Sequence, residues 1–532
     1  MKDKKAIGCG LFIGIIFEIS LCLGRLVTVG NLGNAGVLLL ELILGIVGFS
    51  LLYHLLFRYS AKGEYEEYKK LDKRWYLLLI WGIMFLCYLP CYLSFFPGIT
   101  SYDTERITEQ AYGLRPFDNF QPFLHTIIWT ACIRFEQYSG VALSAIVIYS
   151  IGQMLTLTGV FTYVLRYMVK NGINKVILFC TFLMYTFCPS IVLFSFITTK
   201  DILFGTSVLL LVLQMVELCR DAEAFMKSGR KLVLFTLTGI VSCLLRNNMI
   251  YVLMITAIVQ PFVVRETWKR TVVTFLAIIC GYFVISGPVY GAMGIQPGYA
   301  REMLSVPMSQ LANVYQRAKD DIEPEDEQIL LKFVPDIQKY ERQFADPIKY
   351  TFNEEAYATD KGEFWRLWLK YLQQETIWYV DAFLVLNSPL WYMEDDTVDP
   401  YISLGLYGKP YIFEQTDHFP GIKAFYTDMA EYNIADDGIF RLPVIKQFFS
   451  VALPIWVILV ALCALMVLKK IRWIMPILPL LLLWMTYLLG PVSNFRYMFP
   501  IIISYPIIVM VVLQNGVLEK KTPKGGQEEE IC

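Results

Sequence analysis

Residues 6–27 read AIGCGLFIGIIFEISLCLGRLV, and this stretch decides the fold class because it is apolar and long enough to cross a membrane as one helix. Lys2, Lys4 and Lys5 precede it, as cations precede the apolar core of a signal peptide. No small-residue cleavage pattern follows, however, and a second apolar run begins almost at once. We therefore expect the stretch to remain in the protein as its first membrane span.

Similar apolar runs recur along the chain, which has 532 residues, 56% of them hydrophobic and 17% charged. This composition predicts an all-α polytopic membrane protein with about 12 transmembrane helices. An even number of spans places both termini on one side. The predicted spans are residues 6–27, 36–57, 75–96, 141–168, 174–193, 202–218, 232–246, 248–264, 271–290, 447–468, 472–490 and 497–514.

Charge is distributed unevenly although the net charge is only −1. Residues 291–445 hold 26 acidic side chains against 13 basic ones, so we expect this region to be an extracytoplasmic, mainly helical domain or loop. Positive charge in short loops marks the cytoplasmic side. The basic loops are residues 58–74, 166–175, 220–231, 265–270 and 469–472, and they predict cytoplasmic N- and C-termini.

These patterns divide the chain into four parts. Residues 1–290 form an N-terminal membrane domain with an outer-face loop at 97–140, the acidic region 291–445 follows, residues 446–514 supply the C-terminal membrane helices, and 515–532 form a cytoplasmic tail. The apolar stretch 122–134 is short for a span and predicts a helix at the outer interface. Residues 362–386 predict a long helix whose aromatic face packs against the membrane domain or the lipid headgroups.

Four polar groups are expected to meet at the outer side, because each lies at the end of an apolar run. The run 232–264 is expected to break into two helices at its polar triplet, which then lines a cavity. The groups are Asp103 with the following segment Asp118, Gln121 and His125; Lys200 and Asp201; Arg246, Asn247 and Asn248; and Arg496 and Tyr497.

These residue types suit transfer of a group from a phosphate. A carboxylate accepts a proton from an attacking hydroxyl, and a cation stabilises the phosphate that leaves. Each residue also has a simpler structural explanation: Asp103 as a solvated loop acid, Lys200 and Asp201 as a local ion pair or helix cap, and Arg496 as an interfacial anchor. Arg246 is the hardest to explain in this way, because a charge within a membrane is costly.

Several well-defined chemistries lack their sequence signature. The chain contains no phosphate-binding glycine loop before Lys-Ser/Thr, no dinucleotide-binding glycine pattern, no His-Glu-x-x-His and no paired Cys-x-x-Cys. Ten of the 12 cysteines lie in or beside apolar runs, so no disulfide framework is expected. Nucleotide hydrolysis, a structural zinc site and a nucleic-acid partner are therefore not predicted.

The order of these features resembles the GT-C superfamily of integral-membrane glycosyltransferases, which includes protein O-mannosyltransferases and aminoarabinose transferases. The resemblance covers residues 75–290 and 447–514. The chain is also similar to uncharacterised bacterial relatives that carry Lys-Asp, Arg-Asn-Asn and Arg-Tyr at the later turns. In this comparison Asp103 looks like the catalytic base and Asp201 like the second acid. The chain departs from the pattern at Gln121, where many members have histidine before the proline.

The resemblance implies an inverting transfer of a sugar from a polyprenyl-phosphate donor to a hydroxyl of a glycan, lipid or protein acceptor. Asp103 would deprotonate the acceptor, while Lys200, Arg246 or Arg496 would stabilise the leaving phosphate. No cofactor is expected, and a divalent metal ion stays open as an alternative. The absence of cysteines from the acidic region and of a eukaryotic retention signal favours a location in the cell membrane of a bacterium, within the cell envelope.

Three alternative functions make different demands on the polar residues. A transporter or lipid-linked glycan flippase would need charged residues within the spans, where Glu18, Arg25 and Glu41 are the candidates. A glycan polymerase or ligase would share the outer-face placement and depend on arginines in outer loops. A membrane scaffold would tolerate replacement of each polar residue singly.

Overall fold

A computed structural model describes residues 2–59, 69–395, 404–406, 409–430, 440 and 442–516, so the predicted tail lies outside the described residues from position 517 onward. Within these ranges the chain is mostly helical, with a single two-stranded sheet. Seven helical segments are long and apolar enough to cross a membrane. The protein is therefore an all-α membrane protein.

The seven segments are α1 (Lys2–Thr28), α2 (Ala35–Arg58), α4 (Arg74–Ser94), α7 (Ser144–Lys170), α10 (Lys200–Arg220), α14 (Trp268–Val284), which continues through a π-helical turn into α15 (Tyr290–Ala292), and α26 (Phe495–Ile502), which leads into α27 (Tyr505–Gly516).

The prediction of about 12 transmembrane helices is wrong, because seven segments of the described chain are long and apolar enough to cross a membrane. The other five predicted spans fold as helices of 10 to 17 residues: α8 (Lys175–Phe187), α12 (Gly229–Leu245), α13 (Met249–Val263), α24 (Leu453–Val467) and α25 (Leu478–Tyr487). Proline and polar residues end these apolar runs early, as Pro189 does after α8 by starting the short helix α9 (Pro189–Phe194). At 1.5 Å per residue, the ten residues of α25 cover about 15 Å, half of a hydrocarbon core.

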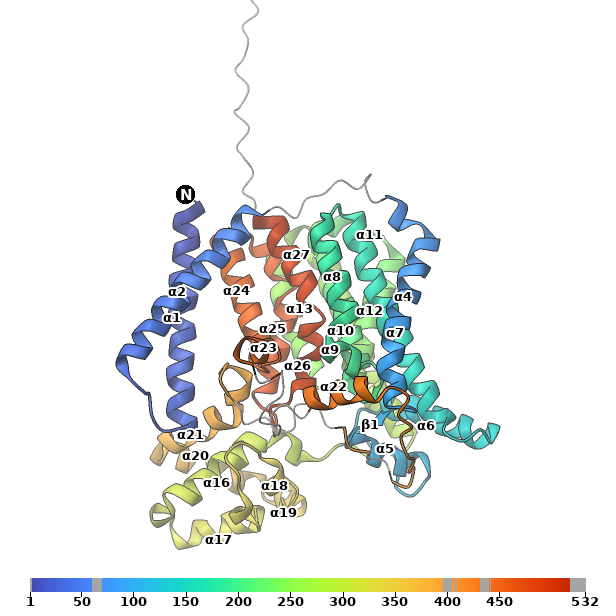
Figure 1. The fold of residues 1–532 in the computed structure, drawn as a ribbon. Coiled ribbons are helices and arrows are strands. Elements are labelled where there is room, and N and C mark those ends of the chain that lie inside the picture. The colour runs from blue at the N-terminus through green and yellow to red at the C-terminus, as the bar shows by residue number, and fades with distance from the viewer. Residues whose placement is uncertain are drawn as a thin grey trace, which may run out of the picture.

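Figure 1 shows the membrane helices side by side, with the start of α1 at one end of the bundle. The helices α5 (Asp103–Ala111) and α6 (Phe123–Ser139) lie at the opposite end, together with the helices of the acidic region. The chain therefore places the loop after α4 and the acidic region at the same end, which we call the site end.

The acidic region has a hydrophobic core of its own. Its helices are α16 (Ser305–Arg317), α17 (Pro324–Phe333), α18 (Asp346–Lys349), α19 (Glu354–Thr359), α20 (Lys361–Gln374) and α21 (Thr376–Asn387), followed by α22 (Pro420–Ala430) and α23 (Pro443–Phe448). The single helix expected at 362–386 is broken at Glu375. Its Phe364 and Tyr371 are buried against Leu311 and Phe333 of the same region rather than against the membrane helices.

Helix α10 lies at the centre of the membrane bundle, and 78% of its apolar window is buried. Gly205 allows α26 to pack closely against it, because a Cβ atom there would come within 2.8 Å of the Phe499 ring. This contact brings the start of α26 beside the start of α10, and both starts carry charged residues.

Candidate functional site

Two short strands join distant parts of the chain at the site end. Strand β1 (Ile99–Thr100) pairs in parallel with β2 (Ile197–Thr198), Ile99 opposite Ile197. A helix starts shortly after each strand, α5 at Asp103 and α10 at Lys200. Because parallel strands run in the same direction, the two helix starts lie at the same end of the pair.

Gly98 makes the approach of β1 to the bundle sterically allowed. Its φ is +147°, and a Cβ atom would lie 2.9 Å from the Ser150 hydroxyl and 3.0 Å from Ile146 of α7. An L-amino acid with a side chain would be strained here in both backbone and packing. The hydroxyl of Ser101 then donates to the carbonyl of Thr198 at 2.8 Å, which fixes the loop against β2.

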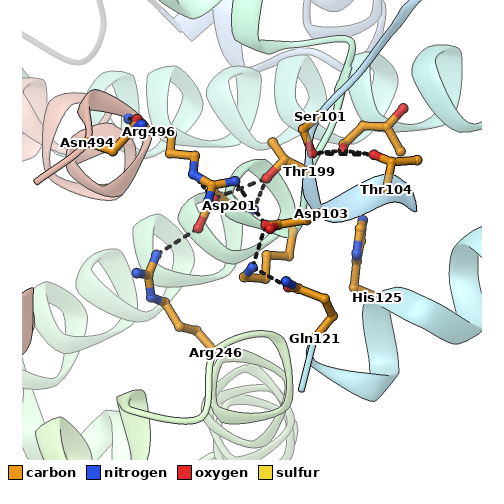
Figure 2. A network of polar contacts seen from close by, with 12 residues as sticks. Ser101, Asp103, Thr104, Gln121, His125, Thr199, Asp201, Arg246, Asn494 and Arg496 are labelled. Atoms are coloured by element: carbon orange, nitrogen blue, oxygen red, sulfur yellow. Dashed lines mark hydrogen bonds and ion pairs between the residues drawn. The ribbon is translucent and has the colours of Figure 1, made fainter. Parts of the chain in front are cut away.

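Asp103 lies between two cations that come from different helices. Lys200 Nζ donates to Asp103 Oδ2 at 2.8 Å, and Arg496 Nη1 donates to the same oxygen at 2.9 Å (Figure 2). Lys200 also donates to Gln121 Oε1 at 2.5 Å. Among the described residues none donates a side-chain hydrogen bond to Asp103 Oδ1, so one oxygen of the carboxylate stays open.

Asp201 forms the second half of the network. Its carboxylate is almost fully buried, with 1% of the side chain exposed, and accepts from Arg246 Nη1 at 2.7 Å and from the Thr199 hydroxyl at 3.1 Å. Arg496 Nε lies 3.7 Å from Asp201 Oδ2. Since Arg496 also contacts Asp103, it connects the two acids.

Aromatic rings enclose the guanidinium of Arg246. Its central carbon lies 4.4 Å from the ring centre of Tyr497 and 4.7 Å from that of Tyr487, and the two rings stack with their centres 5.6 Å apart. Rings at this distance stabilise a cation and exclude water from its faces. Arg246 lies in the break between α12 and α13, as the polar triplet predicts.

The network carries more positive than negative charge. Two carboxylates face three cations, namely Asp103 and Asp201 with Lys200, Arg246 and Arg496. Burial raises the pKa of Asp103, but the charges of Arg496 and Lys200 outweigh it and hold that pKa well below its ordinary value. Asp103 is therefore ionised at neutral pH, and the excess of cations over carboxylates suits the site to bind an anion.

The space beside the network is small. A cavity of about 20 Å³ is lined by Ser101, Tyr102, Phe194, Ile197, Thr199, Asn494 and Arg496. This volume is close to that of one water molecule. A ligand larger than water that enters this cavity must therefore displace some of these side chains.

His125 lies behind the network and is neutral. Its side chain is buried, and Nε2 forms a 2.8 Å hydrogen bond with the Tyr149 hydroxyl, which in turn donates to the Thr199 carbonyl at 3.3 Å. Burial, followed by the positive charge of Lys200, lowers the pKa of His125 to about 4. His125 therefore acts as a hydrogen-bonding group rather than a cation at neutral pH.

This pKa predicts a pH-dependent stability. The unfolded chain protonates His125 near pH 6.5, whereas the folded protein resists protonation until about pH 4, so the free energy of unfolding falls as pH drops through this window. We expect a loss of up to about 3 kcal/mol, since one pKa unit corresponds to about 1.4 kcal/mol. Chemical denaturation of the purified protein between pH 4 and 8 measures it. His125→Gln should flatten the curve, whereas the exposed control His418→Gln should not; equal slopes would contradict the assignment.

Three other predicted residues surround the network without joining it. Asp118 forms an ion pair with Arg106. Asn247 Oδ1 accepts from the Tyr282 hydroxyl at 3.4 Å, and Asn248 donates to the Thr486 hydroxyl at 2.7 Å. These residues position the segments that carry Gln121 and Arg246.

Sequence reasoning did not single out Tyr149 or Tyr487, whereas Thr199 belongs to the polar segment before α10. Thr199 had a local signal, because a threonine two residues before an acid at a helix start is a capping pattern, and its hydroxyl accepts from the Asp201 backbone N–H at 3.4 Å. Tyr149 and Tyr487 had none, since their partners are distant in the chain. Within the described ranges no group of three His, Cys, Asp or Glu residues is placed to hold a metal ion.

A family model matches residues 117–526, which is most of the chain, and it is described as a family of unknown function, DUF6020. Asp103 precedes the matched range, whereas Lys200, Asp201, Arg246 and Arg496 lie within it. Comparison with curated proteins and with solved structures finds no match. The chain thus belongs to the DUF6020 family.

Proposed function

We propose that the protein is an integral-membrane glycosyltransferase of GT-C type. It transfers a sugar, with inversion, from a polyprenyl-phosphate donor to a hydroxyl of a glycan, lipid or protein acceptor at the outer face of the cell membrane. The observation that carries this proposal is the network in which Asp103 is bound by Lys200 and Arg496 while Asp201 is bound by Arg246. The network combines a proton acceptor with an excess of cations at one end of a membrane bundle.

The proposed orientation places the site end outside the cell. The start of α1 lies at the other end of the bundle and is preceded by lysines, which favour the cytoplasmic side. The acidic region then lies outside, next to the site. A lipid-linked donor enters from the outer leaflet, where its phosphate reaches the cations and its chain stays in the bilayer.

The chemistry follows from the charges of the network. The acceptor O–H bond breaks as Asp103 Oδ1 takes the proton, the acceptor oxygen bonds to C1 of the sugar, and the bond from C1 to the phosphate oxygen breaks with its electron pair going to the phosphate. Lys200 and Arg496 stabilise the charge that develops there. Asp201 holds Arg246 and Arg496 in place for this step.

Donor binding also activates the base in this proposal. In the structure Lys200 and Arg496 lower the pKa of Asp103, which makes it a weak base. A donor phosphate competes for the same two cations and weakens their hold on the carboxylate. Asp103 therefore becomes more basic only when a donor is present.

The transporter alternative finds less support in the contacts of the charged residues within the spans. Arg25 donates to Glu41 at 2.7 Å and to Glu394 at 3.0 Å, and these contacts tie α1 and α2 to the segment that follows α21. The three residues form a closed ion cluster rather than a row across the membrane. A glycan polymerase or ligase would use the same donor at the same face. It would depend on arginines in outer loops, whereas the proposed transferase needs a base, which Asp103 supplies.

The test is a turnover assay with the purified full-length protein in detergent. Polyprenyl-phosphate sugars extracted from membranes are supplied with candidate acceptors, and released polyprenyl phosphate is measured by mass spectrometry. We expect release that depends on both donor and acceptor. If no donor is consumed and proteoliposomes instead move lipid-linked sugars between leaflets, the flippase alternative is correct and the proposal fails.

A further inference from the structure

A second polar cavity lies at the end of the bundle opposite the candidate site. Its volume is about 590 Å³, and it is formed where α7 and α10 end, α12 begins and α11 (Ala222–Lys227) crosses between them. Figure 1 shows α11 at the end away from β1 and α5. Helix α10 connects the two places, and its 21 residues span about 30 Å. The cavity is therefore separate from the network around Asp103.

Positive charge dominates the lining of this cavity. Three of its cations have acidic partners: Arg166 and Lys170 contact Asp72 at 2.8 and 3.9 Å, and Lys231 contacts Glu217 at 3.0 Å. Arg220 donates to a neutral amide, and Arg230 has no ion pair with any residue in the described ranges. The charged lining residues are Arg166, Lys170, Arg220, Arg230 and Lys231 against Glu217 and Asp221. The cavity keeps charge that its own acids do not neutralise.

Two buried polar atoms in the lining lack partners. Tyr167 is 7% exposed, and its hydroxyl forms no hydrogen bond with any described residue; the same holds for Gln214 Oε1. The Arg220 guanidinium lies 5.7 Å from the centre of the Tyr167 ring. Unpaired buried groups are rare because they are costly. A ligand with an anionic acceptor for the tyrosine and a hydroxyl for the glutamine would satisfy both.

The cavity also has an apolar side that faces the lipid. Leu234 lies one turn further along α12 than Lys231, and Tyr163 lies one turn before Tyr167 on α7. Both side chains are exposed at the bundle surface, which is where acyl chains lie. Charge at the helix ends and apolar surface toward the membrane centre match the order of groups in a lipid.

We propose that this cavity binds the phosphate-bearing headgroup of an anionic bilayer lipid from the leaflet opposite the candidate site. The phosphate accepts hydrogen bonds from Arg220, Arg230 and the Tyr167 hydroxyl, a headgroup hydroxyl donates to Gln214, and the acyl chains leave past Leu234. Basic pockets between membrane helices bind headgroups in this way. This site does not depend on the proposed transferase activity.

The test measures lipid retained by the full-length protein with native mass spectrometry, after titration with phosphatidylglycerol or phosphatidylcholine in detergent. We expect preferential retention of phosphatidylglycerol. The Arg220→Gln/Arg230→Gln variant should lose about tenfold in affinity, because two charge-assisted hydrogen bonds are removed. Tyr167→Phe removes one oxygen and should lose severalfold, which keeps the test valid if the double variant does not fold. The charge-matched control is Lys469→Gln/Lys470→Gln, which removes two exposed positive charges outside the cavity.

Three outcomes would overturn the proposal. One is equal retention of phosphatidylglycerol and phosphatidylcholine by the wild type. A second is wild-type affinity for phosphatidylglycerol in both cavity variants. The third is stabilisation of lipid-free protein by millimolar inorganic phosphate to the same extent as by phosphatidylglycerol, which would identify a soluble phosphate compound as the ligand in place of a lipid.

Discussion

Replacement of Asp103 by asparagine is expected to lower sugar transfer by about 10²- to 10⁴-fold, the usual contribution of a general base. Asparagine keeps the shape of the side chain and can still accept from Lys200 and Arg496, but it cannot take a proton from the acceptor. The loss should therefore appear in kcat, while the affinity for the donor is kept or rises because the cations are no longer shared with a carboxylate. Single-turnover release of polyprenyl phosphate measures the effect.

Glu105→Gln is the matched control for this variant. Glu105 lies two residues further along α5, is exposed and also carries a carboxylate. We expect it to transfer sugar at the wild-type rate with an unchanged melting temperature. A folded Asp103→Asn protein with wild-type turnover would remove the base from the proposed mechanism.

Replacement of Arg246 by methionine is expected to destabilise the protein by about 3–5 kcal/mol, the cost of leaving one partner of a buried ion pair uncompensated. Asp201 would keep only the Thr199 hydroxyl and the longer 3.7 Å contact with Arg496. The rings of Tyr487 and Tyr497 would also lose the cation that they enclose. Denaturant titration in detergent micelles measures the change.

The double variant Arg246→Met/Asp201→Asn separates charge from packing. Because it removes both members of the pair, it should recover most of the stability that Arg246→Met loses, while transfer remains low. Equal stability of the single and double variants would show that the ion pair is not the source of the loss. Wild-type stability of Arg246→Met would show that Asp201 is not held as the structure indicates.

The meeting of Asp103, Lys200, Arg246 and Arg496 at one end of the bundle could be predicted from the sequence. Each residue lies at the end of an apolar run, and alternation of the runs across a membrane places these ends on one side. The break at Arg246 was also predictable, because a polar triplet within an apolar run stops a helix from crossing lipid.

The pairing of the charges could not be predicted. Lys200 and Asp201 are neighbours and suggested a local ion pair, but successive residues of a helix point in different directions. Lys200 therefore reaches Asp103, and Asp201 reaches Arg246. The parallel pairing of β1 with β2 decides this choice, and strands of two residues leave no periodic signal in the sequence.

The spans and the aromatic face were misjudged because hydrophobicity alone identifies neither where a helix ends nor which surface an apolar face packs against. The run that contains α25 is apolar enough for a span, yet its helix has only ten residues. Phe364 and Tyr371 are apolar enough to face lipid, yet the helices α16 and α17 of the acidic region cover them. The first outcome depends on local proline and polar residues, and the second on tertiary contacts between residues distant in sequence.

The ion pair between Asp103 and Arg496 joins residues 393 positions apart, which sets an order for biosynthesis. Membrane insertion proceeds from the N-terminus, so Asp103, Lys200, Asp201 and Arg246 assemble before the ribosome has made α26. Until then the two acids face only two cations, and nothing links them. A chain that stalls before α26 can therefore insert most of its helices and still lack Arg496, the residue that connects the two acids.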